Sequence, residues 1–251
     1  MTVQNVSSQR LSGRVSIVTG ASAGIGRAIS LALAEAGATI IMVARSRDKL
    51  DQLSGEITAT GGTARPVVAD VSIEADVERV FEVCGEEFGR VDLLVNNAGN
   101  TTRFPTDELS LSDWQRVLDV NVTGVFLCSR AALRMMKPRR SGRIINIGSV
   151  AAKAPRQDAI AYSTSKAALE GLTRSLAVDG RDHGITASIV QPGNTRSELW
   201  TPQRGPLADK EGIMDATELA RVVVLVASMP DDINMYEAIV HPIRMPWMGR
   251  G

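Results

Sequence analysis

Residues Val15–Gly26 read VSIVTGASAGIG, a short apolar run that passes directly into a glycine-rich turn. The run Val15–Thr19 predicts a buried β-strand, and Ile25–Ala36 after the turn has the periodicity of a helix. Glycines allow a tight turn and a close approach to a pyrophosphate, whose charge the free N–H groups of a helix N-terminus can bind. The spacing GxxxGxG differs from the commoner GxGxxG, so an ordinary βα turn is the alternative. The position directly after a strand favours a dinucleotide-binding loop.

Similar apolar runs alternate with amphipathic segments along the rest of the chain. The further predicted strands are Thr39–Ala44, Pro66–Ala69, Val91–Asn96, Arg143–Ile147, Ile185–Val190 and Glu237–His241. The further predicted helices are Arg47–Thr60, Ala75–Phe88, Ser112–Met136, Ala161–Arg181 and Thr217–Ser228. This alternation predicts right-handed βαβ crossovers and strands covered on both faces. We therefore expect an α/β fold: a Rossmann-type, doubly wound parallel sheet of about seven strands in three layers, α/β/α.

The length of 251 residues fits one domain, and no repeat or linker divides the chain. We expect residues 1–12 to form a flexible N-terminal segment and residues 13–251 a single domain. An irregular stretch at about residues 194–215 follows the sixth predicted strand, where ligand-binding loops occur in parallel sheets. We interpret it as a substrate lid in which Pro202, Gly205 and Pro206 limit helix content. Within it, Trp200 could line the substrate pocket or merely cover the core.

The bulk composition argues against several classes of partner. Lys plus Arg and Asp plus Glu both total 28, which gives no electrostatic case for binding nucleic acid or an anionic membrane. Cys84 and Cys128 have no CxxC spacing and no nearby His, so we expect reduced thiols and no metal site. The first 12 residues lack the apolar core of a signal peptide, and no apolar stretch is long enough to span a bilayer. We expect a soluble, cytoplasmic protein.

The end of the second predicted strand bears on the choice of cofactor. A cofactor with free ribose hydroxyls usually meets an acid here, whereas a 2′-phosphate needs a cation. The chain has Ala44 and then Arg45, whose guanidinium suits a phosphate. A surface Arg at a helix start is the alternative interpretation. The sequence therefore favours NADP, with NAD as the alternative.

Tyr162 and Lys166 are four residues apart and would share one face of a helix. A free tyrosine, with a pKa of about 10, is a poor base at neutral pH, but a nearby ammonium favours the phenolate. Ser149 ends a predicted strand at the sheet edge, where its hydroxyl could bond a reacting oxygen. Asn121 lies beside Gly124 in a predicted helix, which suggests a local kink, although a plain buried amide is the alternative.

Taken together, these residues resemble the classical short-chain dehydrogenase/reductase family from about residue 11 to about residue 221. Thr19–Gly26 is similar to the family's TGxxxGIG loop, and residues 96–99 to its NNAG motif. Asn121, Ser149, Tyr162 and Lys166 match its catalytic tetrad, and Pro192-Gly193 matches the PG after its sixth strand. Because the motifs occur in order and at the right spacing, the resemblance is highly specific.

The resemblance implies an NAD(P)-dependent oxidoreductase acting on a small carbonyl or secondary alcohol. Tyr162 would be the general acid/base, Ser149 would hold the reacting oxygen, Lys166 would bind the nicotinamide ribose, and Asn121 would anchor a water. The cofactor-binding residues that it implies are Gly20, Ser22, Ala23, Gly24, Ile25, Gly26, Arg45, Ser46, Asp70, Val71, Asn97, Ala98, Gly99, Tyr162, Lys166, Pro192, Gly193, Thr195 and Ser197. Classical members assemble through the helices that hold Asn121 and Tyr162, so we expect a homotetramer or homodimer.

The chain departs from the family pattern at three of these positions. Ala23 stands where many NADP-dependent members have a basic residue, which weakens the NADP prediction. Thr195 and Ser197 replace the usual PGxVxT pattern after Gly193. Two alternative functions stay open: a lyase or epimerase that uses bound NAD(P) transiently, and a regulatory protein that binds the cofactor without turnover. The intact tetrad argues against the second, because binding alone does not require all four residues.

Overall fold

The computed structural model describes residues 10–197 and 205–246, and in this part of the chain one parallel sheet forms the centre of the fold. Its strands are β1 (Val15–Thr19), β2 (Thr39–Ala44), β3 (Thr63–Val68), β4 (Leu93–Asn96), β5 (Gly142–Ile147), β6 (Ile185–Pro192) and β7 (Glu237–Val240). They lie in the order β3-β2-β1-β4-β5-β6-β7, and all neighbours are parallel. The strand order reverses between β1 and β4. The predicted doubly wound sheet is confirmed.

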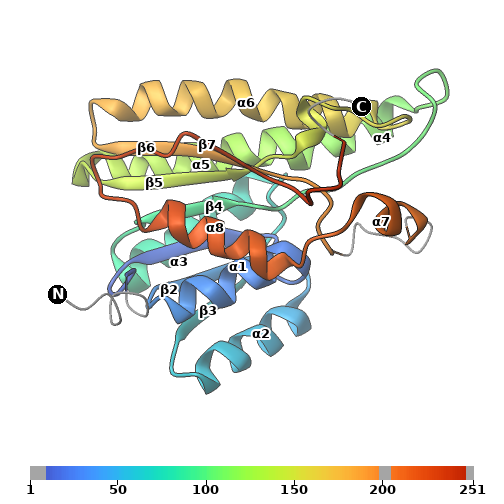
Figure 1. Cartoon of the computed structure of the whole chain (residues 1–251). Helices are drawn as coiled ribbons and strands as arrows, with labels where there is room; N and C mark the ends of the chain where they lie inside the picture. The colour runs from blue at the N-terminus through green and yellow to red at the C-terminus, as the bar shows by residue number, and fades with distance from the viewer. Residues whose placement is uncertain (1–9, 198–204, 247–251) are drawn as a thin grey trace.

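Helices cover both faces of the sheet (Figure 1). They are α1 (Gly24–Glu35), α2 (Arg47–Ala59), α3 (Glu74–Phe88), α4 (Leu111–Leu118), α5 (Gly124–Met136), α6 (Ile160–Arg181), α7 (Gly205–Glu211) and α8 (Ala216–Ala227). Helices α1, α2 and α8 pack on one face, and α3, α5 and α6 on the other. Along β2, Ile40 and Met42 enter the first core while Ile41 and Val43 enter the second. This two-sided burial explains why the strands are almost continuously apolar.

Strand β3 begins at Thr63, earlier than the predicted start at Pro66, and ends at Val68 rather than Ala69. Pro66 lies inside the strand, opposite Met42 of β2. Strand β3 is at the edge of the sheet and bonds only β2. The N–H that Pro66 lacks therefore leaves no carbonyl of a second neighbouring strand without a donor. The edge position also explains the exposed and polar start of the strand, which the apolar pattern did not indicate.

The long helix predicted over Ser112–Met136 is divided into two. Helix α4 ends at Leu118, a π-helical turn covers Asp119–Thr123, and α5 begins at Gly124. A Cβ on Gly124 would lie 2.9 Å from a side-chain carbon of Val71, so the helix approaches the segment after β3 too closely for a side chain. A π turn widens the helix locally and is common at functional sites. The irregularity predicted at Asn121 is therefore present.

The predicted lid, whose helix content Pro202, Gly205 and Pro206 were expected to limit, contains a short helix in its described part, where α7 spans Gly205–Glu211. Pro206 follows the first residue of this helix, and a proline in the first turn removes no hydrogen bond. Helix α7 lies apart from both helix layers, beyond the end of β6 (Figure 1). The two ends of the segment predicted to be a lid pair with each other, since Met214 N donates to Asn194 O at 2.8 Å and Arg196 N donates to Met214 O at 2.9 Å.

The predicted domain boundary at residue 13 stays a prediction. Within the preceding segment, Leu11 is buried, and its N–H donates to Ala36 O at 2.9 Å. Among the helices of the described residues, none is both long enough and apolar enough to cross a membrane.

Candidate cofactor and active site

A cavity of about 410 Å³ opens over the carboxyl ends of the central strands, around the point where the strand order reverses. Parallel sheets bind ligands at this point, and the volume is within the range of cofactor sites. The predicted cofactor residues that line it are Gly20, Ser22, Ala23, Gly24, Ile25, Arg45, Ser46, Asp70, Val71, Asn97, Ala98, Gly99, Tyr162, Lys166, Pro192 and Ser197. The structure thus brings together residues from most of the chain.

The glycine loop is held against the segment that follows β4. Asn97 Nδ2 donates to Thr19 O at 3.0 Å and to Gly20 O at 3.2 Å, and Thr19 Oγ1 accepts from the backbone N–H of Asn97 at 3.0 Å. A Cβ on Gly26 would lie 2.2 Å from Gly20 O and 2.4 Å from Asn97 Nδ2. Gly26 does not line the cavity. Its lack of a side chain instead lets α1 pack directly beneath the loop.

The N-terminus of α1 faces this cavity with its backbone donors unused by any cap. Ala23 is the capping residue and provides no side-chain hydrogen bond, and the first turn has no acidic residue. Helix α4, in contrast, is capped by Ser110, which accepts from Asp113 N. Free N–H groups at a helix N-terminus are suited to an anion. Gly24 and Ile25, in the first turn of α1, both line the cavity.

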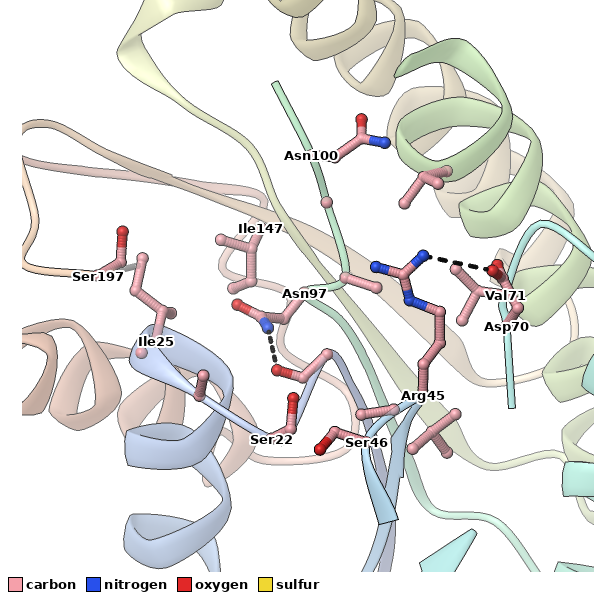
Figure 2. Close-up of a pocket in the computed structure, with 18 of the residues that line it drawn as sticks. Ser22, Ile25, Arg45, Ser46, Asp70, Val71, Asn97, Asn100, Ile147 and Ser197 are labelled. Carbon is pink, nitrogen blue, oxygen red and sulfur yellow. Dashed lines mark hydrogen bonds and ion pairs between the residues drawn. The ribbon is translucent and has the colours of Figure 1, made fainter. Parts of the chain in front are cut away.

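Charged side chains gather at the end of the cavity near β2 and β3. Arg45 extends from the end of β2 toward Asp70, and its Nη1 lies 3.7 Å from Asp70 Oδ2 (Figure 2). The Arg45 side chain is 80% exposed, so this ion pair is weak and leaves the guanidinium accessible. Lys49, on the first turn of α2, also lines the cavity. Lys49 was not predicted as a site residue, although its place one turn after Arg45 was a signal.

Tyr162 and Lys166 lie near the other end of the cavity on α6. Lys166 is buried, with 5% of its surface exposed, and its Nζ donates to Ile147 O at 2.8 Å. This burial lowers the pKa of Lys166 to about 8, because an ammonium is poorly solvated there. Lys166 Nζ lies 5.7 Å from the centroid of the Tyr162 ring. A buried cation therefore stands beside a tyrosine that faces the cavity.

Asn121 lies behind the residues that line the cavity and is not itself among them; it does not line the adjoining smaller cavity, described below, either. Its Oδ1 accepts from Asn100 N at 2.8 Å, and its Nδ2 donates to Asn100 O and Ser165 Oγ, both at 2.9 Å. Both hydrogens of the amide are thus engaged within the protein. The side chain joins the π turn to the segment after β4 and to α6. The water expected at Asn121 stays a prediction. Because both amide hydrogens of Asn121 are engaged, other groups would have to supply the remaining hydrogen bonds of that water.

A second cavity, of about 130 Å³, adjoins the first and shares Ile25, Tyr162, Pro192 and Ser197 with it. Ser149 lines this second cavity, and its Oγ accepts from Ala151 N at 3.1 Å, which leaves the hydroxyl hydrogen available to a ligand. Gly193 and Thr195, predicted to contact the cofactor, line this cavity instead of the first. Trp200 lies outside the described residues.

Two further side chains of the second cavity were not identified from the sequence. Arg103 comes from the loop after β4, and Arg156 from the segment that precedes α6. No motif or periodicity singled them out, because only the fold brings these two loops together. Over residues 10–197 and 205–246, no group of three or more His, Cys, Asp or Glu residues could hold a metal ion.

Comparisons with known proteins agree with this geometry. The family model described as short chain dehydrogenase matches residues 14–207. A 3-oxoacyl-[acyl-carrier-protein] reductase of Synechocystis sp. is 41% identical over 190 residues, which cover 75% of this chain and 77% of the relative. Glucose 1-dehydrogenase 2 of Bacillus subtilis is 40% identical, with coverages of 75% and 74%. A metagenomic short-chain oxidoreductase solved in complex with NADP is 35% identical, with a TM-score of 0.82 over 93% of this chain and 99% of its own.

Proposed function

The chain belongs to the short-chain dehydrogenase family of oxidoreductases, and on this premise we propose that Tyr162 is the general acid/base for hydride transfer between NADPH and a small carbonyl or secondary alcohol. One observation carries the proposal. Tyr162 lines both the large cavity, with the glycine loop, and the small one, with Ser149. A group at this junction can exchange a proton with a substrate that contacts the nicotinamide.

The large cavity fits a dinucleotide phosphate. The uncapped, acid-free N-terminus of α1 would bind the pyrophosphate, and the loop glycines leave room for it. Arg45 and Ser46 would contact the 2′-phosphate, with Lys49 contributing charge. Asp70 acts against a preference for NADP over NAD because its carboxylate pairs with Arg45, but this ion pair is exposed and weak. The NADP in the metagenomic relative supports this choice.

When bound, the nicotinamide supplies or accepts the hydride. During reduction, Tyr162 donates its hydroxyl proton to the carbonyl oxygen, and during oxidation it takes the proton of the alcohol. Ser149 donates a hydrogen bond to the same oxygen and stabilises the charge that develops there. Lys166 favours the phenolate form of Tyr162 through its positive charge and binds the ribose hydroxyls. Asn121 keeps Asn100 and Ser165 in place behind the reacting groups.

The experiment that tests this proposal compares two tyrosine substitutions. Tyr162→Phe removes the proposed proton donor, and we expect kcat to fall by about 100-fold or more with a carbonyl substrate, as for loss of a general acid. We expect the Kd for NADPH to stay nearly unchanged. Tyr236→Phe is the matched control, because Tyr236 lines neither cavity and its hydroxyl lies 3.5 Å from Glu170 O. Normal turnover by Tyr162→Phe would remove Tyr162 from the mechanism.

We also propose that the protein is a homotetramer, or a homodimer, built through α5 and α6. Phe126 of α5 is 48% exposed and Val178 of α6 is 56% exposed, which supports a contact at these helices. Leu169 and Leu176 are buried in the single chain and would not contribute. A monomer in light scattering at micromolar concentration would overturn this assembly. The cytoplasmic location stays a prediction.

A further inference from the structure

The charged side chains that line the small cavity, among the described residues, are all positive. They are Arg103 and Arg156, and the described lining residues include no Asp or Glu. The loops that carry the two arginines are joined, since Phe104 N donates to Asp158 O at 3.1 Å. Because Ser149 and Tyr162 line the same cavity, both arginines belong to the space in which the reacting part of the substrate would lie.

Arg156 is already neutralised by the protein. Its Nη2 donates to Asn194 Oδ1 at 3.2 Å and forms a close ion pair with Glu211, a residue that is 8% exposed at the end of α7. Burial acts to raise the pKa of Glu211, but hydrogen bonds from Arg156 and Asn194 outweigh it, so this pKa lies below its ordinary value. Glu211 is therefore ionised at neutral pH. Arg156 ties the lid to the segment before α6 and leaves little charge for a ligand.

Arg103 differs from Arg156 in having no such partner. Among the interactions of the described residues, none involves the Arg103 side chain, and the residue is exposed at the cavity. A guanidinium presents a planar set of donors that matches a carboxylate in two parallel hydrogen bonds. The cavity thus has, on one side, a cation that no described residue pairs with, and on another the proposed acid/base.

The remaining lining of the small cavity limits what can accompany a carboxylate. Most of it consists of small or apolar residues, such as Val150, Ala151, Ala154, Ala159 and Met245. The volume of about 130 Å³ is below that of pockets for drug-sized ligands. A compact substrate with few polar groups fits this lining better than a sugar, whose hydroxyls would need several partners.

We propose that the substrate is a small oxo acid or hydroxy acid whose carboxylate binds Arg103. The inference rests on the proposed function and adds the substrate class. In the direction of reduction, the carbonyl carbon gains a hydride, the carbonyl oxygen gains the Tyr162 proton, and the dinucleotide is oxidised. The carboxylate stays unchanged and serves only to orient the substrate.

The test measures kcat/KM with NADPH for short 2-oxo and 3-oxo acids, each beside its methyl ester. The ester keeps the reacting carbonyl and removes the charge. We expect the unmodified protein to prefer at least one acid over its ester by about tenfold or more, as for a hydrogen bond between charged groups. In Arg103→Met this preference disappears through a higher KM for the acid, while the ester is turned over as before. Arg103→Lys keeps part of the preference.

Arg139→Met provides the matched control, because Arg139 is exposed, lines neither cavity and makes the same change in net charge. It should leave the preference for the acid intact. Turnover of esters with no preference for any acid would overturn this inference alone, as would a preference that survives in Arg103→Met. Absence of turnover with every acid and every ester would instead overturn the proposed function, and this inference with it.

Discussion

Replacing Gly26 by Ala should disturb the glycine loop without altering any group that contacts a ligand. Gly26 is the third residue of α1 and has an ordinary helical backbone, so alanine fits its dihedral angles. The added Cβ would nevertheless lie 2.2 Å from Gly20 O and 2.4 Å from Asn97 Nδ2. Since real Cβ atoms do not come this close to other atoms, either the loop or the Asn97 side chain must move.

The expected cost follows from these contacts. Overpacking of a tightly packed site costs about 1–3 kcal/mol. Disturbing the hydrogen bonds from Asn97 to Thr19 O and Gly20 O adds about 1 kcal/mol each. Alanine offsets part of this, by about 0.4–1 kcal/mol, because it restricts the unfolded chain. We therefore expect a net loss of roughly 2–4 kcal/mol, which lowers Tm by about 5–15 °C in a protein of this size.

Thermal unfolding with and without NADPH measures both consequences. The loss in Tm should be larger with NADPH present, because the displaced loop also binds the cofactor less well. Gly55→Ala is the matched control: Gly55 lies in α2, and its Cβ would meet nothing within 4 Å. That substitution should raise Tm by about 1–3 °C through helix propensity. A Gly26→Ala protein with unchanged Tm and unchanged NADPH affinity would show that the close packing of α1 beneath the loop is not needed.

Two further predictions concern buried titratable groups. Lys166→Met should abolish turnover yet stabilise the cofactor-free protein at pH 7 by about 1–3 kcal/mol, because below pH 8 the folded chain holds a buried ammonium that the unfolded chain solvates. This gain in stability should shrink as the pH rises from 8 to 10.5, since Lys166 in the folded chain is then already neutral. Urea unfolding at pH 7 and at pH 10 measures the change in stability. If Lys166→Met were equally destabilising at both pH values, the role of burial would be contradicted. Burial raises the pKa of both cysteine thiols, Cys84 and Cys128, to about 12. A thiol reagent at pH 8 should therefore label neither cysteine in the native protein and both after unfolding, and fast native labelling would be inconsistent with this burial.

The doubly wound sheet could be predicted because its strands carry two-sided apolar patterns. Ile40–Val43 is an example, since successive residues enter opposite cores. The pairing of Tyr162 and Lys166 could also be predicted, because helix geometry places residues four apart on one face. Most residues that line the large cavity could also be predicted from the order of the motifs, because the carboxyl ends of parallel strands meet at one edge of the sheet.

Features that depend on contacts between distant segments could not be predicted in this way. The edge position of β3, which accommodates Pro66, is a property of the assembled sheet. Helix α7 has a weak local pattern, and its Glu211 is fixed by Arg156, 55 residues earlier. Arg103 had no sequence signal, because its interpretation depends on which side chains several distant loops bring to one cavity.

We propose above that the large cavity binds a nicotinamide dinucleotide and prefers NADPH. Fluorescence titration of the purified protein with NADPH and with NADH tests it most directly, with Arg45→Ala measured in parallel. We expect saturable binding of both dinucleotides, tighter for NADPH by about tenfold, and a loss of this preference in Arg45→Ala. Equal affinities would contradict the assignment of Arg45 to the phosphate, and no binding of either dinucleotide would contradict the proposal that the large cavity is a cofactor site.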